Sequence, residues 1–231
     1  IVTYTNSNDL EVSGTVNIVN GTFRTALTGN GMNRSVFVKP GGTWLMCNAQ
    51  MFLPLFSCGY GCSGGSNLSG NFKNQNGTIG IYNSVVEIAQ NWEDDSSPGG
   101  GNRTITGGCI KIGENFTNKG SNDMYDNTCM EIGLHTSGSW KNEYRVSFQN
   151  SVILRLVSNG NFENVATAPN GVFGGPGSPD ISVLGLANGN LVNNAPWSAQ
   201  VLNFCIVGGS VSGSMTADFN NDVTNNNTPA A

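Results

Sequence analysis

The sequence EYRVSFQNSVILRLVS (residues 143–158) carries the strongest indication of the fold. Its apolar residues fall on even positions both before and after the polar pair Gln149-Asn150; they are Tyr144, Val146, Phe148, Val152, Leu154 and Leu156. Alternate residues of a β-strand share one face, and a slip of one residue would exchange the two faces. Because the phase survives the polar pair, we predict two short strands joined by a corner that keeps the same side inward, as in a β-solenoid.

The rest of the chain also has the pattern of short strands. Alternating or continuous apolar runs are separated by Gly, Asn, Ser and Pro clusters and lie at 10–18, 35–38, 43–47, 79–88, 104–112, 129–134, 144–157, 181–186 and 201–207. The best candidate for a helix, NSVVEIAQNW at 83–92, is rich in β-branched residues and has no regular helical spacing, which favours a strand. The sequence therefore predicts an all-β protein.

Two all-β architectures fit these runs. In DLEVSGTVNIVNGTF (9–23), Asn20-Gly21 could close the tight hairpin of a β-sandwich or jelly roll. Related phrases recur after Gly14, Gly42, Gly77 and Gly138 at irregular spacing, which indicates a degenerate β-solenoid, or parallel β-helix. We favour the solenoid. We expect a repeat region over 1–164, an irregular loop with terminal strands packed on the same domain over 165–216, and a low-complexity tail over 217–231.

The composition narrows the functional classes. The 231 residues include 32 Gly and 34 Asn but only 11% charged residues, with a net charge of −5. No basic cluster could neutralise a nucleic-acid backbone, and no stretch approaches the roughly 20 apolar residues of a membrane-spanning helix. We therefore expect neither nucleic-acid binding nor membrane insertion.

Six cysteines, an even number, are compatible with three disulfides formed in an oxidising compartment. The nearest links in sequence are Cys109 to Cys129, and Cys58 to either Cys62 or Cys47; the alternative is that several are small buried residues. The Cys58/Cys62 spacing with one histidine in the chain does not complete a zinc set.

No arrangement of side chains predicts catalysis or metal binding. The sequence lacks the GxSxG motif that would supply a nucleophilic serine for His135 to activate. We therefore expect His135 to be an ordinary strand or surface histidine. The acidic run Glu93-Asp94-Asp95 is expected in a surface loop rather than in a calcium site. Asp218, Asn220 and Asp222 have the oxygen spacing of a calcium loop, but Val223 replaces the glycine that such a loop needs. We predict no catalytic residue, no cofactor and no metal.

Action on carbohydrates, or binding of them, is an alternative function for a β-solenoid. Hydrolysis of a glycosidic bond needs two carboxylates, which the scattered acidic residues do not exclude. Exposed aromatic rings could stack on sugars, and the candidates are Trp44, Trp92, Trp140 and Trp197. Each of them is more typical of a core or corner position.

The phrases LEVSGTVNIVNGTF, VKPGGTWLM and NGTIGI resemble the degenerate repeats of secreted bacterial β-helix surface proteins, and APWSAQVLNFCIVGGSVSG is similar to segments of Bacteroidota surface proteins. The resemblance implies export, with type IX secretion as the expected route, and a cell-surface or adhesive role. The sorting domain of such cargo is not recognisable here.

We therefore expect an extracellular, non-enzymatic adhesin or filament subunit. Its expected partners are other copies of itself, other surface proteins or glycans, with residues 1–5 adding a strand to a neighbour's sheet edge. The alternative is a polysaccharide-active β-helix enzyme or a glycan-binding module.

Overall fold

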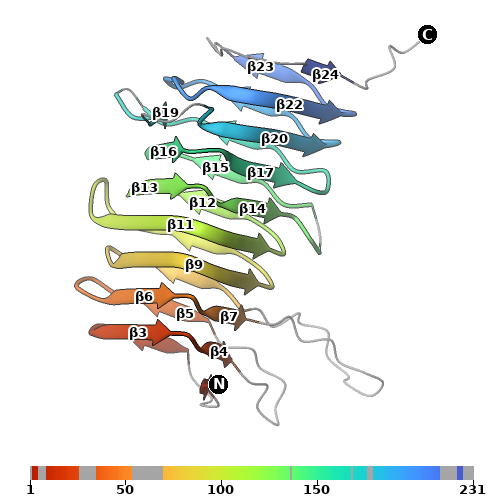
Figure 1. The fold of residues 1–231 in the computed structure, drawn as a ribbon. Helices are drawn as coiled ribbons and strands as arrows, with labels where there is room; N and C mark the ends of the chain where they lie inside the picture. The colour runs from red at the N-terminus through yellow and green to blue at the C-terminus, as the bar shows by residue number, and fades with distance from the viewer. Residues whose placement is uncertain are drawn as a thin grey trace, which may run out of the picture.

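The structure is a computed structural model that describes residues 2–4, 9–25, 35–53, 70–135, 137–167, 169–175, 179–213 and 223–225. Within these ranges the regular elements are all β-strands, arranged in a 15-stranded and a 9-stranded sheet of parallel pairs. The strands stack as rungs of one column, with the N-terminus at the bottom and the C-terminus at the top in Figure 1. The chain is a parallel β-solenoid, which confirms the favoured prediction.

The 15-stranded sheet covers two sides of the column, because β9 (Thr78–Ile88) and β11 (Gly101–Ile112) bend and contribute to both. Face 1 contains their first halves with β3 (Thr15–Val19), β6 (Thr43–Cys47), β13 (Ser121–Asp126), β16 (Arg145–Gln149) and β19 (Val172–Gly174). Face 2 contains their second halves with β1 (Val2–Tyr4), β4 (Thr22–Thr25), β7 (Gln50–Leu53), β14 (Cys129–Ile132), β17 (Val152–Leu156), β20 (Ile181–Ala187), β22 (Val201–Val207) and β24 (Val223–Asn225).

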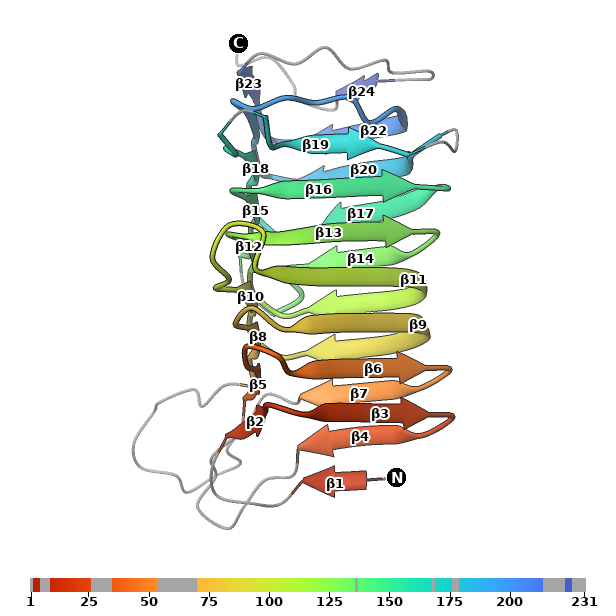
Figure 2. The same cartoon turned by 90° about the vertical axis from the view of Figure 1, so that its left-hand side faces the viewer.

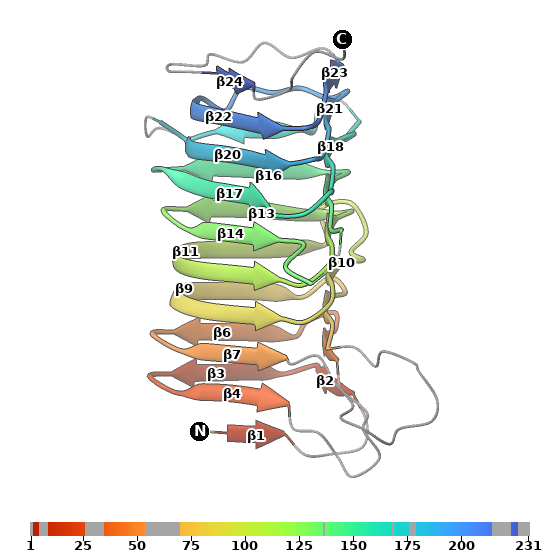
Figure 3. The ribbon, with the colours of Figure 1, turned by 90° about the vertical axis from the view of Figure 1, so that its right-hand side faces the viewer.

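Face 3 is the nine-stranded sheet of three-residue strands, seen edge-on as a vertical line in Figures 2 and 3. Its strands are β2 (Leu10–Val12), β5 (Val36–Val38), β8 (Phe72–Asn74), β10 (Trp92–Asp94), β12 (Phe116–Asn118), β15 (Trp140–Asn142), β18 (Phe162–Asn164), β21 (Leu191–Asn193) and β23 (Val211–Gly213). One coil of the solenoid therefore passes through faces 3, 1 and 2 in turn.

The corner between faces 1 and 2 keeps the inward phase that the sequence predicts. Val146, Phe148, Val152, Leu154 and Leu156 are all buried, on both sides of Gln149-Asn150. Asparagines occupy this corner with left-handed backbone, a conformation that Asn tolerates better than most residues; they include Asn20 (φ 49°), Asn48 (φ 49°), Asn83 (φ 47°), Asn127 (φ 46°) and Asn150 (φ 51°). The Asn20-Gly21 turn is one of these corners and not a hairpin, because β3 and β4 pair with different strands.

Aromatic side chains form a continuous column through the core. Neighbouring rings lie 4.2–6.4 Å apart between centroids in the series Phe23, Trp44, Phe72, Trp92, Phe116, Trp140 and Phe162, and Trp197 follows at 5.6 Å. Contacts of this kind add about 0.5–1.5 kcal/mol each beyond the burial of their area. All four tryptophans belong to the core, as the sequence analysis favours.

Each strand of face 3 from β8 to β21 begins just after a polar residue and ends on an inward polar one. The phrases are NFKN (71–74), NWED (91–94), NFTN (115–118), SWKN (139–142), NFEN (161–164) and NLVN (190–193). In each phrase the second residue is an apolar core side chain, an aromatic ring in all but Leu191. This phrase, recurring every 20–29 residues, is the repeat of the solenoid, and the sequence analysis did not identify it.

The first residue of each phrase forms an outer ladder along the column. The side-chain oxygen of Asn71 accepts the backbone N–H of Asn91 at 3.1 Å, and Asn91 does the same for Asn115 at 3.1 Å. The ladder continues through Ser139, Asn161, Asn190 and Ser210. It satisfies the backbone donors of successive coils at the corner where face 3 begins.

The last residue of each phrase forms an inner ladder. Amide groups of Asn118, Asn142, Asn164 and Asn193 hydrogen-bond one to the next at 3.1, 2.9 and 2.6 Å, and all four are fully buried. Buried amides must be paired to avoid a desolvation cost, and the stack pairs each with its neighbour.

Two segments are more regular than their composition indicates. The part of 165–216 expected to be an irregular loop contains β19 and β21, whereas β20 matches the apolar run at 181–186. In the expected tail, Val223–Asn225 form β24, which pairs with β22. In both places pairing with the preceding coil imposes strand structure that the local sequence does not specify.

Candidate functional site

Two groups of charged side chains in the described residues are candidates for a site: one lies inside the column, and the other forms a row on the outside of face 2. Asp94, Arg103 and Asp123 are buried in the interior together with Tyr125. The outer row comprises Glu87, Lys111, Glu131 and Arg155. The interior group is considered first.

Asp94 occupies a position of the inner asparagine ladder, in register with Asn74 and Asn118. One of its carboxylate oxygens accepts the hydroxyls of Ser96 and Ser121, both at 2.6 Å, and the other accepts the backbone N–H groups of Gly120 and Ser121, both at 2.8 Å. Burial works to raise the pKa of Asp94, but the charge of Arg103 and these hydrogen bonds hold it below its usual value. Asp94 is therefore a charged structural acceptor that ties β10 to the following coil.

Arg103 and Asp123 form a bidentate ion pair, with Nε–Oδ1 2.7 Å and Nη2–Oδ2 2.6 Å, and neither side chain is exposed. They stand in a column of face 1 whose neighbours are Ile79 and Val146. The guanidinium also lies 4.9 Å from the ring centre of Phe116, a cation–π distance.

One buried cation thus faces two buried carboxylates. Burial raises the pKa of Asp123 to about 7, although the charge and hydrogen bonds of Arg103 oppose the shift, and Asp94 adds to it. Perturbed pKa values often mark active sites, but this group is sealed inside the column. Its contacts join neighbouring coils, so its role is structural.

The other two residues of the acidic run lie outside. Glu93 and Asp95 pair with Lys73 at 3.3 and 3.0 Å, and Asp95 also pairs with Lys119 at 3.0 Å. The expectation of a surface loop for Glu93-Asp94-Asp95 is therefore wrong for its centre: Trp92–Asp94 are β10, whose alternation turns Asp94 inward.

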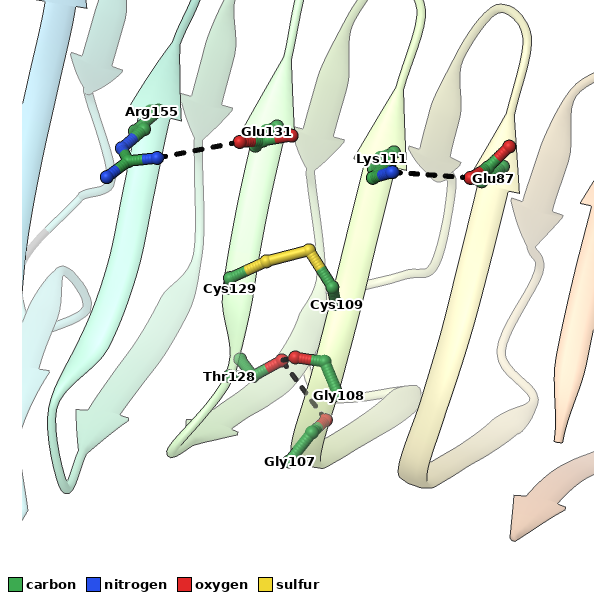
Figure 4. Close-up of a disulfide and its surroundings, with 9 residues drawn as sticks. All are labelled: Glu87, Gly107, Gly108, Cys109, Lys111, Thr128, Cys129, Glu131 and Arg155. Carbon is green, nitrogen blue, oxygen red and sulfur yellow. Dashed lines mark hydrogen bonds and ion pairs between the residues drawn. A yellow bond between two sulfur atoms is a disulfide. The ribbon is translucent and has the colours of Figure 1, made fainter. Parts of the chain in front are cut away.

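The outer row on face 2 alternates in sign along the column. Register pairs Glu87 with Lys111, Lys111 with Glu131, and Glu131 with Arg155 on successive strands. The closest charged atoms are 3.4 Å apart in Glu87–Lys111 and 3.7 Å apart in Glu131–Arg155. Figure 4 shows the four side chains as one line across four strands. Phe52 extends the row at one end and Gly185 at the other.

A parallel row, two residues earlier on the same strands, carries the disulfide between Cys109 and Cys129 (Figure 4). The predicted link is confirmed, and it joins adjacent coils on the outside of face 2. Val85 and Ile153 flank it in register. Cys47 and Cys205 carry free thiols, while Cys58 and Cys62 lie outside the described residues.

Two shallow hollows lie along the outer row. The N-terminal hollow, about 450 Å³, is lined by Phe52, Glu87, Lys111 and Glu131 with Leu134 and His135 at its rim. The C-terminal hollow, about 440 Å³, lies over Gly185 and is lined by Arg155, Val157, Val183, Cys205 and Val207. Face 2 therefore carries a register-aligned row of charges together with two hollows lined in part by apolar side chains.

The remaining candidate residues are dispersed. His135 is an exposed residue at a bend beyond β14, and Asp218, Asn220 and Asp222 lie outside the described residues. Among the residues that the structure describes, no three His, Cys, Asp or Glu side chains gather in a way that could hold a metal ion. No helix in the described ranges could cross a membrane.

The sequence analysis missed Arg103, Asp123 and the outer row. Their spacings of 20–24 residues match the phrase spacing, so alignment of the chain on that repeat would have placed them in common columns. Comparison with known proteins finds no match to a family, to a curated sequence or to a solved structure.

Proposed function

We propose that this chain is an extracellular, non-enzymatic structural protein, an adhesin or a subunit of a surface assembly. The observation that carries the proposal is the unbroken parallel strand pairing of both sheets through the column, accompanied by two ladders and an aromatic stack. Each coil buries its apolar side only against its neighbours, which makes a solenoid a stiff, extended support.

The cross-coil disulfide supports an extracellular location. Disulfides persist in oxidising compartments and are uncommon in cytosolic proteins. The Cys109–Cys129 link also closes only 20 residues between adjacent coils, so it reinforces the column locally.

Assembly of the column uses the edges of its sheets. β1 and β24 are the outermost strands of the described 15-stranded sheet. An edge strand offers backbone donors and acceptors to another chain. Since the sheets are parallel, β1 of one copy added to β24 of another would continue the same pairing head to tail, a heterologous contact that builds filaments.

A competitor peptide tests this contact. The peptide IVTYT (residues 1–5) should occupy the β24 edge and reduce the sedimentation coefficient of the assembled protein. The matched control is the peptide IVPYT, because proline removes one backbone donor from the added strand. Equal effects of both peptides, or none from IVTYT at millimolar concentration, would reject strand addition.

A second function is favoured by one observation in the N-terminal hollow. Glu87 and Glu131 stand two strands apart, about 10 Å, with Lys111 between them. This spacing between strands lies just above the range of carboxylate separations in inverting glycosidases, about 6.5–9.5 Å. A screen of polysaccharides for new reducing ends, repeated with Glu131→Gln, discriminates the two functions: release that the variant abolishes would establish the enzyme.

A further inference from the structure

The outer row on face 2 has a symmetry that its alternation alone does not require. Extended by register from β7 to β20, it reads Phe52, Glu87, Lys111, Glu131, Arg155 and Gly185, and Arg24 on β4 and Cys205 on β22 lie beyond its two ends. The six side chains from Phe52 to Gly185 are, in this order, bulky, negative, positive, negative, positive and small. Reversing the order places a positive residue wherever there was a negative one, and a small one wherever there was a bulky one.

Two identical copies can place face 2 against face 2 with twofold symmetry in two ways. A twofold axis along the column sets each residue opposite itself, so that Glu87 faces Glu87 and Lys111 faces Lys111. A twofold axis along the strands makes the columns antiparallel and sets Glu87 opposite Arg155, and Lys111 opposite Glu131. Only the antiparallel arrangement is electrostatically complementary, and juxtaposed like charges disfavour the other.

The shape of the face agrees with the same register. The antiparallel arrangement sets the partly exposed Phe52 of one copy against the C-terminal hollow over Gly185 of the other. In the neighbouring row it places the disulfides opposite one another at the centre, with Val85 facing Ile153 on either side. The apolar contacts therefore favour the same antiparallel arrangement that the charges favour.

The available area suits a modest interface. Eight strands of face 2, from β4 to β22, at about 4.8 Å each and about 16 Å of strand length, give about 600 Å² per copy. Together the two copies bury about 1,200 Å², the lower end of stable interfaces. Partly exposed ion pairs add specificity more than affinity, so a dissociation constant in the micromolar range is expected.

We propose that face 2 is an isologous docking surface that binds face 2 of a second copy of this chain with the two columns antiparallel. The proposal deepens the assembly function by naming a lateral partner. It uses a contact distinct from the end-to-end addition of strands, so either contact can fail without the other.

Charge reversal tests the arrangement through complementation. Lys111→Glu sets the new carboxylate opposite Glu131 of the other copy, and Glu131→Lys sets the new ammonium group opposite Lys111; symmetry repeats each clash twice in the dimer. Each variant alone should bind itself at least about 10-fold more weakly than the unmodified chain in sedimentation equilibrium at low salt. An equimolar mixture of the two variants restores every opposite pair and should associate within about 3-fold of the unmodified protein.

The matched control is Lys141→Glu on face 3. The Lys141 side chain is 40% exposed against 39% for Lys111, and it is likewise ion-paired within the chain. The substitution should leave association unchanged. Melting curves of all variants, and a titration of the unmodified protein to about 0.5 M NaCl, separate lost contacts from lost folding.

The possible results distinguish the lateral contact through face 2 from the end-to-end contact between β1 and β24. A chain that stays monomeric at about 100 µM, a Lys111→Glu variant that dimerises normally, or a mixture no better associated than its components would overturn the docking surface. Filaments insensitive to both charge reversals would overturn it while leaving the assembly function in place. Complementing dimers that never extend further would support it and count against end-to-end addition.

Discussion

At the residue scale, the interior of this solenoid departs from an apolar core at a few positions that are chemically specific. Asp94 replaces an amide in the inner ladder; the hydroxyl of Ser96 in its own coil, and the N–H groups of Gly120 and Ser121 with the Ser121 hydroxyl in the next coil, donate to it. An amide in the same place would present two donors where only acceptors are useful. The negative charge of Asp94 is therefore stabilised by the hydrogen-bond donors around it.

Asp94→Asn is expected to lower the free energy of unfolding by about 1–3 kcal/mol at pH 7, because one acceptor oxygen is lost among buried donors. The pKa of Asp94 is held below the ordinary 3.8, so its stabilisation is complete above that pH and is lost as the pH falls through the folded-state pKa. The gap between variant and unmodified protein should narrow below pH 4.

Urea unfolding between pH 2 and 8 measures this, with Asp126→Asn on the outer surface as the control. A gap that is constant over this range would show that the charge of Asp94 has no special role.

The Arg103–Asp123 pair is expected to be costly to break and inexpensive to replace. Arg103→Ile alone leaves a buried carboxyl without its partner and should cost about 3–5 kcal/mol. The double variant Arg103→Ile/Asp123→Val continues the apolar column of Ile79 and Val146 and should recover part of that loss; the remainder reflects Asp94, which loses the charge of Arg103, and Tyr125, whose hydroxyl loses its acceptor. Chemical unfolding of the single and double variants measures the coupling.

The pH dependence gives a second readout for the pair. The pKa of Asp123 is raised to about 7, so the folded state keeps a proton that the unfolded state releases near pH 4. Stability should therefore fall as the pH rises from about 4 to 7, and the double variant should lack this slope. A double variant that stays as unstable as the single one would mean that the pair is required for the fold.

The contact between Arg103 and Asp123 could not be predicted from the sequence without the length of the coil. Arg103 and Asp123 are 20 residues apart, and their contact exists only because one coil has that length. Without the coil length, each is an ordinary charged residue in a strand. The alternation around Trp92 could have placed Asp94 inward, but a cluster of three acids suggests solvent more strongly than a β-strand.

At the scale of the strands, the alternation of apolar residues predicted which side chains point inward, but it did not predict the length of a coil. The even phase from Tyr144 to Leu156 correctly indicated a corner and an inward side, because strand geometry is local. The phrase with an aromatic residue between polar ones was overlooked, since its spacing varies from 20 to 29 residues with the loops between coils. β20 matches the apolar run at 181–186, whereas the three-residue strands β19 and β21 depend on pairing with neighbouring coils and have no local signal.

The inner ladder should respond to loss of a single amide. Asn142 donates to Asn164 and accepts from Asn118, so Asn142→Ala leaves both neighbours incompletely paired in the core. We expect a loss of about 1–3 kcal/mol in the free energy of unfolding. Asn203→Ala on the exposed side of β22 should change it by less than about 0.5 kcal/mol. Equal effects would contradict a special role for the ladder.

We expect the Cys109–Cys129 disulfide to raise the stability of the column without being required for its fold. Replacing both Cys109 and Cys129 by Ser removes a crosslink that closes 20 residues, worth about 3 kcal/mol in the unfolded-chain account. The far-ultraviolet circular dichroism should remain that of a β-protein, and the midpoint of thermal unfolding should fall. An unchanged midpoint would show that register alone holds these coils together.

At the scale of the whole molecule, the sequence encodes one column of stacked coils with three sheet faces. The even phase across Gln149-Asn150 and the phrases that recur after Gly14, Gly42, Gly77 and Gly138 predicted a solenoid, and that prediction is confirmed. Surface location, type IX export and adhesion stay predictions. Whether a face binds a partner depends on charges from different coils lining up, which only the register reveals.

Electron microscopy of the natively purified, unmodified protein tests the central claim most directly. The account predicts columns that join with one another, end to end as filaments or side by side as antiparallel pairs, at micromolar concentration and low salt. A field of separate single columns under these conditions would contradict an assembly role.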